Sequence, residues 1–347
     1  MGKFADKFKK HYKISLIKGL VLGCLVFVIA LGLGYWYGRA KTLSWTRQIV
    51  NTIKPVRQNN LNFKFVFPLL GYDFADVKPF YENHALEAAL NNYIQSEYKN
   101  KNAQSISVYF RNFPDAGWAG VNQETQYHPG SMLKVLIMIG YYREAELDPS
   151  VLTKTLLYDQ KTKQEADGLD FALPSGLKVG QSYSVEDLIK SMIAVSDNGA
   201  ETLLLNNIDR KILNDAYTDL SISNPDSYSG DYTITPMQYS AFLRILYNAT
   251  YLSDMYSEQA LTIMSQSTYK DGISAGVPQG IEVAQKYGER IDGTTSNVQA
   301  VELHDCGIVY AKTAYSICVM TKGEDVGKLT EAIKNISAIV YGYVSSH

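Results

Sequence analysis

The sequence predicts an α+β protein with one antiparallel β-sheet flanked by helices and an all-helical subdomain, preceded by one transmembrane helix. Three observations support this. An uncharged apolar run lies near the N-terminus, strand-like alternation occurs early and late in the remaining chain, and helical spacing dominates between. The 347 residues are 46% hydrophobic and 20% charged, which is typical of a globular protein and excludes wholesale disorder.

The first element is the run from Gly19 to Gly38, which carries no charge. About 20 apolar residues in a helix span the hydrocarbon core of a bilayer. Six lysines precede the run, and positive residues favour the cytoplasmic side of a membrane. We therefore expect a cytoplasmic tail over residues 1–18, a single-pass transmembrane helix over 19–38, and an extracytoplasmic domain anchored to the cell membrane.

Two other interpretations of this segment are weaker. A cleaved signal peptide has a shorter apolar region and a small-residue cleavage site, and neither is clear here. A lipoprotein signal at Cys24 is disfavoured because the apolar run continues well beyond that cysteine.

Charge is divided unevenly along the chain. Up to Arg47 there are nine basic residues and one acidic residue, whereas the remainder holds 24 basic and 34 acidic residues. A body with this negative excess repels a phosphate backbone, so we expect no nucleic-acid partner.

The elements after the membrane segment follow in order. Residues 39–79 are mixed and punctuated by three prolines, which predicts a stalk or linker, and residues 80–347 are expected to form the folded domain. Apolar spacing predicts a helix within 80–98, and alternation predicts a hairpin of 105–111 with 118–121. Helices are expected over 131–142, 185–205 and 236–247, strands over 307–310 and 316–321, and a closing helix over 328–344.

The first motif that can carry chemistry is Ser131-Met132-Leu133-Lys134. Residues three apart on a helix share a face, so the Lys134 amine can take the proton of a nucleophilic Ser131. The following apolar run would desolvate Lys134 and lower its pKa. The same spacing occurs elsewhere by chance, but only Ser131 follows Pro-Gly at a predicted helix start that enters an apolar run.

Two further motifs follow along the chain. Ser196-Asp197-Asn198 ends a helical stretch, where it is either a polar turn or a proton relay with a substrate-binding amide. Lys286-Tyr287-Gly288 lies on a predicted strand, where the lysine is either a solvated edge residue or a ligand for a substrate carboxylate. A glycine at this position would let the substrate backbone approach.

Together and in this order, the motifs and their flanks resemble the class A-like serine β-lactamase and penicillin-binding protein superfamily. The similarity extends over about residues 80–344. It includes the surroundings of Ser131, the approach to Ser196, and the strand that carries Lys286. The resemblance implies a serine hydrolase of the β-lactamase/transpeptidase type that forms an acyl-enzyme and needs no cofactor, and the N-terminal run adds the expected membrane anchor.

The resemblance also implies a role for each motif residue. Ser131 would be the acylated nucleophile, Lys134 its base, and Ser196 the relay that protonates the leaving nitrogen. Asn198 would hold the substrate amide and Lys286 its carboxylate, beside Tyr287 and Gly288. The backbone N–H groups of Ser131 and Glu289 would form the oxyanion hole.

The sequence departs from the family at two places. Tyr287 stands where the family has a small hydroxyl residue, which puts carboxylate recognition in question. The family's Glu-x-x-Leu-Asn motif, whose glutamate activates the deacylating water, has no counterpart, and the corresponding stretch 215–232 offers only aspartates. We expect slow deacylation because an aspartate is one methylene shorter and small displacements are costly.

Several functions remain open on these grounds. The first is β-lactam hydrolysis, the second is D-Ala-D-Ala carboxypeptidase or transpeptidase activity on peptidoglycan stem peptides, and the third is non-catalytic binding in the cell envelope. No metal site is expected, because the five histidines are scattered. Cys306 and Cys318 would face each other only if their strands pair in one of two neighbouring registers.

Overall fold

The computed structural model describes Leu22, Cys24 and residues 26–38, 54–57, 63–73, 82–169, 175–220, 222–225, 232–292 and 300–346. The chain forms two compact units. One comprises Met1–Lys54 with Asp73–Pro79, and the other comprises Pro55–Tyr72 with Phe80–His347.

In the first unit, Leu22, Cys24 and residues 26–38 are helical, and the side chains of these residues are exposed. Among the residues that the structure describes, no helix is both long enough and apolar enough to cross a membrane. The predicted tail 1–18, and residues 19–21, 23 and 25 of the predicted span, lie outside the described residues. The transmembrane helix is therefore not part of what the structure establishes.

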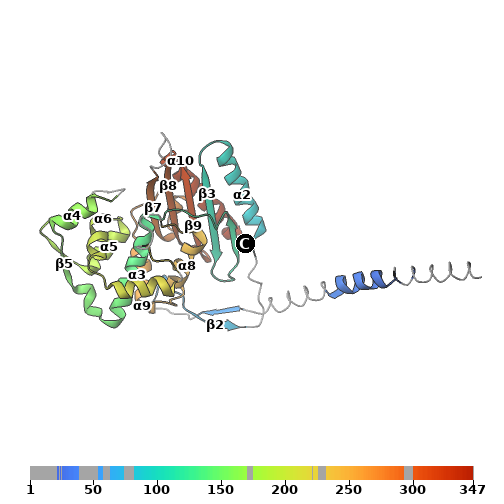
Figure 1. Ribbon diagram of the computed structural model, residues 1–347, viewed down its shortest axis with the longest axis horizontal. Coiled ribbons are helices and arrows are strands. Elements are labelled where there is room, and N and C mark those ends of the chain that lie inside the picture. The colour runs from blue at the N-terminus through green and yellow to red at the C-terminus, as the bar shows by residue number, and fades with distance from the viewer. Residues whose placement is uncertain are drawn as a thin grey trace, which may run out of the picture. The chain divides into compact units, whose positions relative to one another are not determined.

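The second unit is built on one antiparallel five-stranded sheet in the order β4-β3-β9-β8-β7 (Figure 1). Its strands are β3 (Ser105–Asn112), β4 (Trp118–Val121), β7 (Glu282–Asp292), β8 (Ala300–Tyr310) and β9 (Ala314–Gly323). The first two form the predicted hairpin. The last two contain the predicted strands 307–310 and 316–321. The α+β class with an antiparallel sheet is thus confirmed.

Helices cover both faces of this sheet. On one face, Leu86, Leu90 and Ile94 of α2 (His84–Lys99) are buried together with the apolar side of α10 (Val326–Ser346). The four-residue spacing of these α2 side chains places them on one helical face. The opposite face of the sheet packs against α8 (Pro236–Tyr247), within the larger core of the protein.

That larger core belongs to a mainly helical region, which gathers beside the sheet in Figure 1. Its further helices are α3 (Lys134–Leu147), α4 (Gln160–Asp167), α5 (Val185–Ala194), α6 (Asn198–Leu205), α7 (Arg210–Asp219) and α9 (Asp254–Ser265). The prediction of an all-helical subdomain was wrong in one respect. A short two-stranded sheet of β5 (Thr155–Leu157) and β6 (Ser182–Ser184) joins two of its loops.

The pairing register of the sheet determines whether two cysteines can form a disulfide. In the β8–β9 pairing, Cys306 lies opposite Cys318, and the structure joins them in a disulfide. Both side chains are fully buried in the core between the sheet and the helices. A shift of one residue would have placed them on opposite faces, so the question left open by the sequence is settled by strand pairing.

The domain extends further towards the N-terminus than the predicted boundary at residue 80. Phe65 and Val66 are buried in the helical core, and the backbone N–H groups of residues 64–66 donate to the Glu258 carboxylate of α9 at 2.8–3.0 Å. Strands β1 (Lys54–Arg57) and β2 (Leu69–Asp73) flank this segment and pair with each other. Part of the predicted linker is therefore an integral strap of the domain.

Candidate active site

The turn that carries Ser131 is a short 3₁₀ helix, η1 (Gly130–Leu133), which leads directly into α3. Side chains three apart are eclipsed in a 3₁₀ helix, so Ser131 and Lys134 lie one above the other. Lys134 Nζ is 3.0 Å from Ser131 Oγ. The predicted pairing of these two residues thus rests on a 3₁₀ turn instead of the first turn of an α-helix.

Lys134 is fully buried and surrounded by oxygen atoms. Its Nζ donates to the Ser196 carbonyl oxygen at 2.7 Å and to Asn198 Oδ1 at 2.6 Å, and it lies 3.2 Å from Ser196 Oγ. Burial lowers the pKa of Lys134, because the ammonium form loses its hydration. A neutral amine would use its two N–H groups on the two carbonyl acceptors and present its lone pair to the serine hydroxyls.

Ser196 occupies the junction between α5 and α6, where the backbone adopts φ = 61°. This left-handed conformation is uncommon for a residue with a side chain, and it persists only where the surrounding structure holds it. Asp197 supplies that support. It caps α6 by accepting from the Ala200 N–H at 3.0 Å, and it also accepts from the Ser175 hydroxyl at 2.8 Å. The junction is therefore more than a polar turn.

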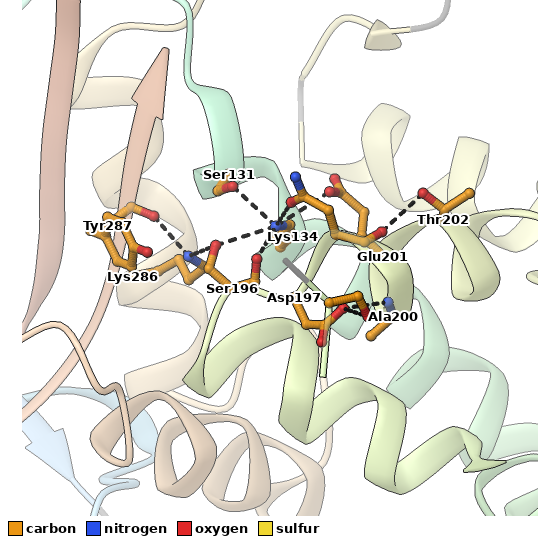
Figure 2. A network of polar contacts seen from close by, with 11 residues as sticks. Ser131, Lys134, Ser196, Asp197, Ala200, Glu201, Thr202, Lys286 and Tyr287 are labelled. Carbon is orange, nitrogen blue, oxygen red and sulfur yellow. Dashed lines mark hydrogen bonds and ion pairs between the residues drawn. The ribbon is translucent and has the colours of Figure 1, made fainter. Parts of the chain in front are cut away.

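Lys286 reaches the same hydroxyl from strand β7. Its Nζ donates to Ser196 Oγ at 2.9 Å and to the Tyr287 carbonyl oxygen at 2.8 Å (Figure 2). The side chain is fully buried, and burial together with the nearby charge of Lys134 holds the pKa of Lys286 well below its ordinary value. Lys286 is thus not a solvated edge residue, and the three motifs meet at Ser196.

Gly288 has a packing role within the chain, and its predicted role in substrate approach stays a prediction. A Cβ at this position would collide with the Pro129 carbonyl oxygen and with Met132, so the glycine admits the chain's own nucleophile turn against β7. Gly130, at φ = 52°, likewise touches the backbone of Glu289. This close packing brings the Ser131 and Glu289 segments together, as an oxyanion hole shared between them requires.

Tyr287 lies against both an aromatic ring and a cation. It is stacked on Tyr269 with ring centres 4.4 Å apart, and Lys286 Nζ is 4.5 Å from its ring centre. Opposite Tyr287 in the β7–β8 register is Asp305, which is fully buried and accepts from the Ile273 N–H at 2.9 Å. Burial raises the pKa of Asp305 to about 7. Tyr287 thus gives Lys286 an aromatic neighbour, where a small hydroxyl residue at position 287 would give it a polar one.

One residue of the site was missed from the sequence. Glu201, in the first turn of α6, places Oε2 3.3 Å from Lys134 Nζ (Figure 2). The sequence feature that could have indicated Glu201 is its spacing. It follows Asn198 by three residues, so the two side chains share a helical face. Asn198 itself turns its carbonyl oxygen towards Lys134, and so helps to orient the lysine.

Potential metal ligands lie together elsewhere. Among the described residues, ligand atoms of Glu82, His84 and Glu87 lie within 4.8 Å of one another at the start of α2. His84 is exposed, and its ring bonds to the Glu87 carboxylate at 3.0 Å. Such surface groups commonly exist without an ion, so this cluster indicates no metal chemistry.

The geometry around Ser131 is suited to nucleophilic acyl transfer. A hydroxyl lies beside a buried amine of lowered pKa, and a second hydroxyl connects that amine to Lys286. Such a chain can carry the Ser131 proton towards a leaving group. The arrangement suits a serine hydrolase in which a lysine would serve as the base.

Comparison with known proteins agrees with this class. The family model of the beta-lactamase enzyme family matches residues 85–344, and the chain belongs to that family. The resemblance predicted from the motifs is thereby confirmed. The comparison with curated proteins gives no match.

Solved structures share the fold at low sequence identity. A mutant of PBP-A, in an acyl-enzyme complex with penicillin G, is 18% identical with a TM-score of 0.64, and the match covers 78% of this chain and all of that one. A beta-lactamase from Sphaerobacter thermophilus is 18% identical (TM-score 0.62; 75% and 98% covered). A class A beta-lactamase from Mycobacterium abscessus is 20% identical (TM-score 0.61; 75% and 99% covered).

Proposed function

We propose that this protein is an extracytoplasmic serine hydrolase that is acylated on Ser131 by β-lactams. The resulting ester between Ser131 and the ring-opened β-lactam is then hydrolysed slowly. The observation that carries the proposal is the continuous chain Ser131–Lys134–Ser196–Lys286, with successive contacts of 3.0, 3.2 and 2.9 Å. The acyl-enzyme described for the structurally similar PBP-A mutant supports β-lactams as the substrate class.

Each residue then has a defined task. Neutral Lys134 takes the proton of Ser131 while Oγ attacks the lactam carbonyl, and Ser196 passes a proton to the leaving nitrogen. Lys286, as an ammonium, would use two of its three N–H groups on Ser196 and on its own chain, which leaves one for a substrate carboxylate. The N–H groups of Ser131 and Glu289 stabilise the oxyanion.

The described acids of segment 215–232 support slow hydrolysis. Asp215 pairs with Lys211 at 2.6 Å, and Asp219 accepts from the Tyr251 hydroxyl at 3.0 Å. Asp226 and Asp231 lie outside the described residues. The same observation favours a second candidate, a D-Ala-D-Ala carboxypeptidase or transpeptidase, because such an enzyme is acylated by penicillin without needing efficient hydrolysis of the adduct.

Labelling with a fluorescent penicillin tests the proposal. Residues 55–347 of the wild type should become covalently labelled, and Ser131→Ala should not, since that variant lacks the hydroxyl that the proposal acylates. Denaturing gel fluorescence and mass spectrometry of the labelled peptide provide the measurement. Equal labelling of both proteins would place the nucleophile elsewhere, and no labelling of either would favour a non-catalytic binding protein.

We also propose that residues 19–38 anchor the protein in the cell membrane, with residues 1–18 in the cytoplasm. The support is the uncharged run and the six lysines before it. Protease added to intact cells or spheroplasts should digest the catalytic domain. Full protection of the domain until the cells are lysed would contradict this topology.

A further inference from the structure

Hydrolysis of an acyl-enzyme needs a proton acceptor for the attacking water, and the described part of segment 215–232 directs its carboxylates to other partners. A carboxylate does reach the site from another element. Glu201 Oε2 lies 3.3 Å from Lys134 Nζ, which is itself 3.0 Å from Ser131 Oγ. The carboxylate is thus two hydrogen-bond lengths from the nucleophile.

Glu201 and Lys134 differ in their exposure to solvent. The Glu201 side chain is 19% exposed, whereas that of Lys134 is 0% exposed. Water can therefore reach the Glu201 side chain without entering the buried chain of amines and hydroxyls. The other acid of this junction, Asp197, is occupied by the Ala200 and Gly176 N–H groups and by the Ser175 hydroxyl.

The oxygen atoms around Lys134 also outnumber its protons. Nζ has five oxygen neighbours, those of Ser131, Asn198 and Glu201 and two from Ser196, but an ammonium has only three N–H groups. The two shortest contacts go to carbonyl oxygens, which can only accept. With 3.3 Å between Lys134 Nζ and Glu201 Oε2, a proton can pass between the two side chains.

We propose that Glu201 is the proton acceptor for water in hydrolysis of the acyl-enzyme. This inference rests on the proposed function and deepens it. The water oxygen bonds to the acyl carbon while its proton goes to the Glu201 carboxylate. The Glu201 proton then passes to Lys134, and the resulting ammonium protonates Ser131 Oγ as the bond between that oxygen and the acyl carbon breaks. Lys134 is again neutral and Glu201 again a carboxylate, as before the attack of water.

The test compares Glu201→Gln, Glu201→Asp and wild type with penicillin G, with Asp215→Asn as the matched control. Asp215 is an exposed acid paired with Lys211 on α7, so neutralising it should leave both steps unchanged. In Glu201→Gln the adduct on Ser131 should still form, and its hydrolysis should slow by about 10²–10⁴-fold. Glu201→Asp should hydrolyse the adduct at an intermediate rate, because its shorter carboxylate can still accept a proton.

Comparing the rates of adduct hydrolysis in Glu201→Gln and Glu201→Asp distinguishes a role in proton transfer from a structural role. Glutamine has the size of glutamate and still accepts a hydrogen bond from Lys134, so a structural role predicts that Glu201→Gln resembles wild type and Glu201→Asp is worse. That order, or wild-type hydrolysis in Glu201→Gln, would overturn the inference. Loss of the adduct in Glu201→Gln alone would overturn it too, by placing Glu201 in acylation. Absence of the adduct in every protein, wild type included, would overturn the proposed function and this inference with it.

Discussion

Replacing Lys134 with methionine is expected to slow acylation of Ser131 by about 10²–10⁴-fold, the usual cost of losing a general base. Methionine keeps an apolar stem that reaches as far as Cε and lacks only the amine, so the fully buried position stays largely filled. Stopped-flow measurement of acylation with a chromogenic β-lactam gives the rate. Lys190→Met, at an exposed position on α5, is the matched control and should acylate at the wild-type rate.

The pH dependence should change in the same variant. Neutral Lys134 is the active form, so the wild-type acylation rate should rise with pH through the pKa of Lys134 and level off above it. Burial lowers that pKa, which moves this rise from the ordinary range of lysine towards neutral pH, while Glu201 acts in the opposite direction. The rise should be absent in Lys134→Met. Unchanged acylation or an unchanged profile would identify a different base.

Mixing the ectodomain with excess penicillin should consume one equivalent of β-lactam in a burst, followed by turnover about 10²–10⁴-fold slower. The physical reason is the position of the acids. The described acids of segment 215–232 contact Lys211 and Tyr251. The acceptor inferred above, Glu201, shares its carboxylate with Lys134, which slows its use as a base for water. Quenched-flow measurement of the intact β-lactam that remains and intact-mass detection of the adduct provide the two readouts.

Rapid steady hydrolysis without a burst would show that deacylation keeps pace with acylation. In that case the structure directs mutagenesis first to Glu201, since Asp219 is bonded to Tyr251. Asp226, which lies outside the described residues, would be tested next. A burst well below one equivalent would instead indicate that only part of the protein is competent for acylation.

The sequence by itself determined the elements whose signals are local. Residues Ser131 and Lys134 share one turn, and the apolar run after them predicts burial of the lysine, so their pairing follows from three-residue spacing. The helix Pro236–Tyr247 begins and ends at the predicted residues, because Thr235 and Gln238 form a capping box within four residues of chain. The family likewise followed from short motifs and their order along the chain.

Only the tertiary structure decided the features that depend on residues distant in sequence. The Lys134–Glu201 pair spans 67 positions, and the glycine at 288 is explained by the turn at 129–132 that packs on it. The segment 64–66 belongs to the domain because its backbone N–H groups donate to Glu258, and the disulfide depends on the register of two strands. Composition and periodicity report which face of an element is buried, but which partner meets that face is set by packing across the whole fold.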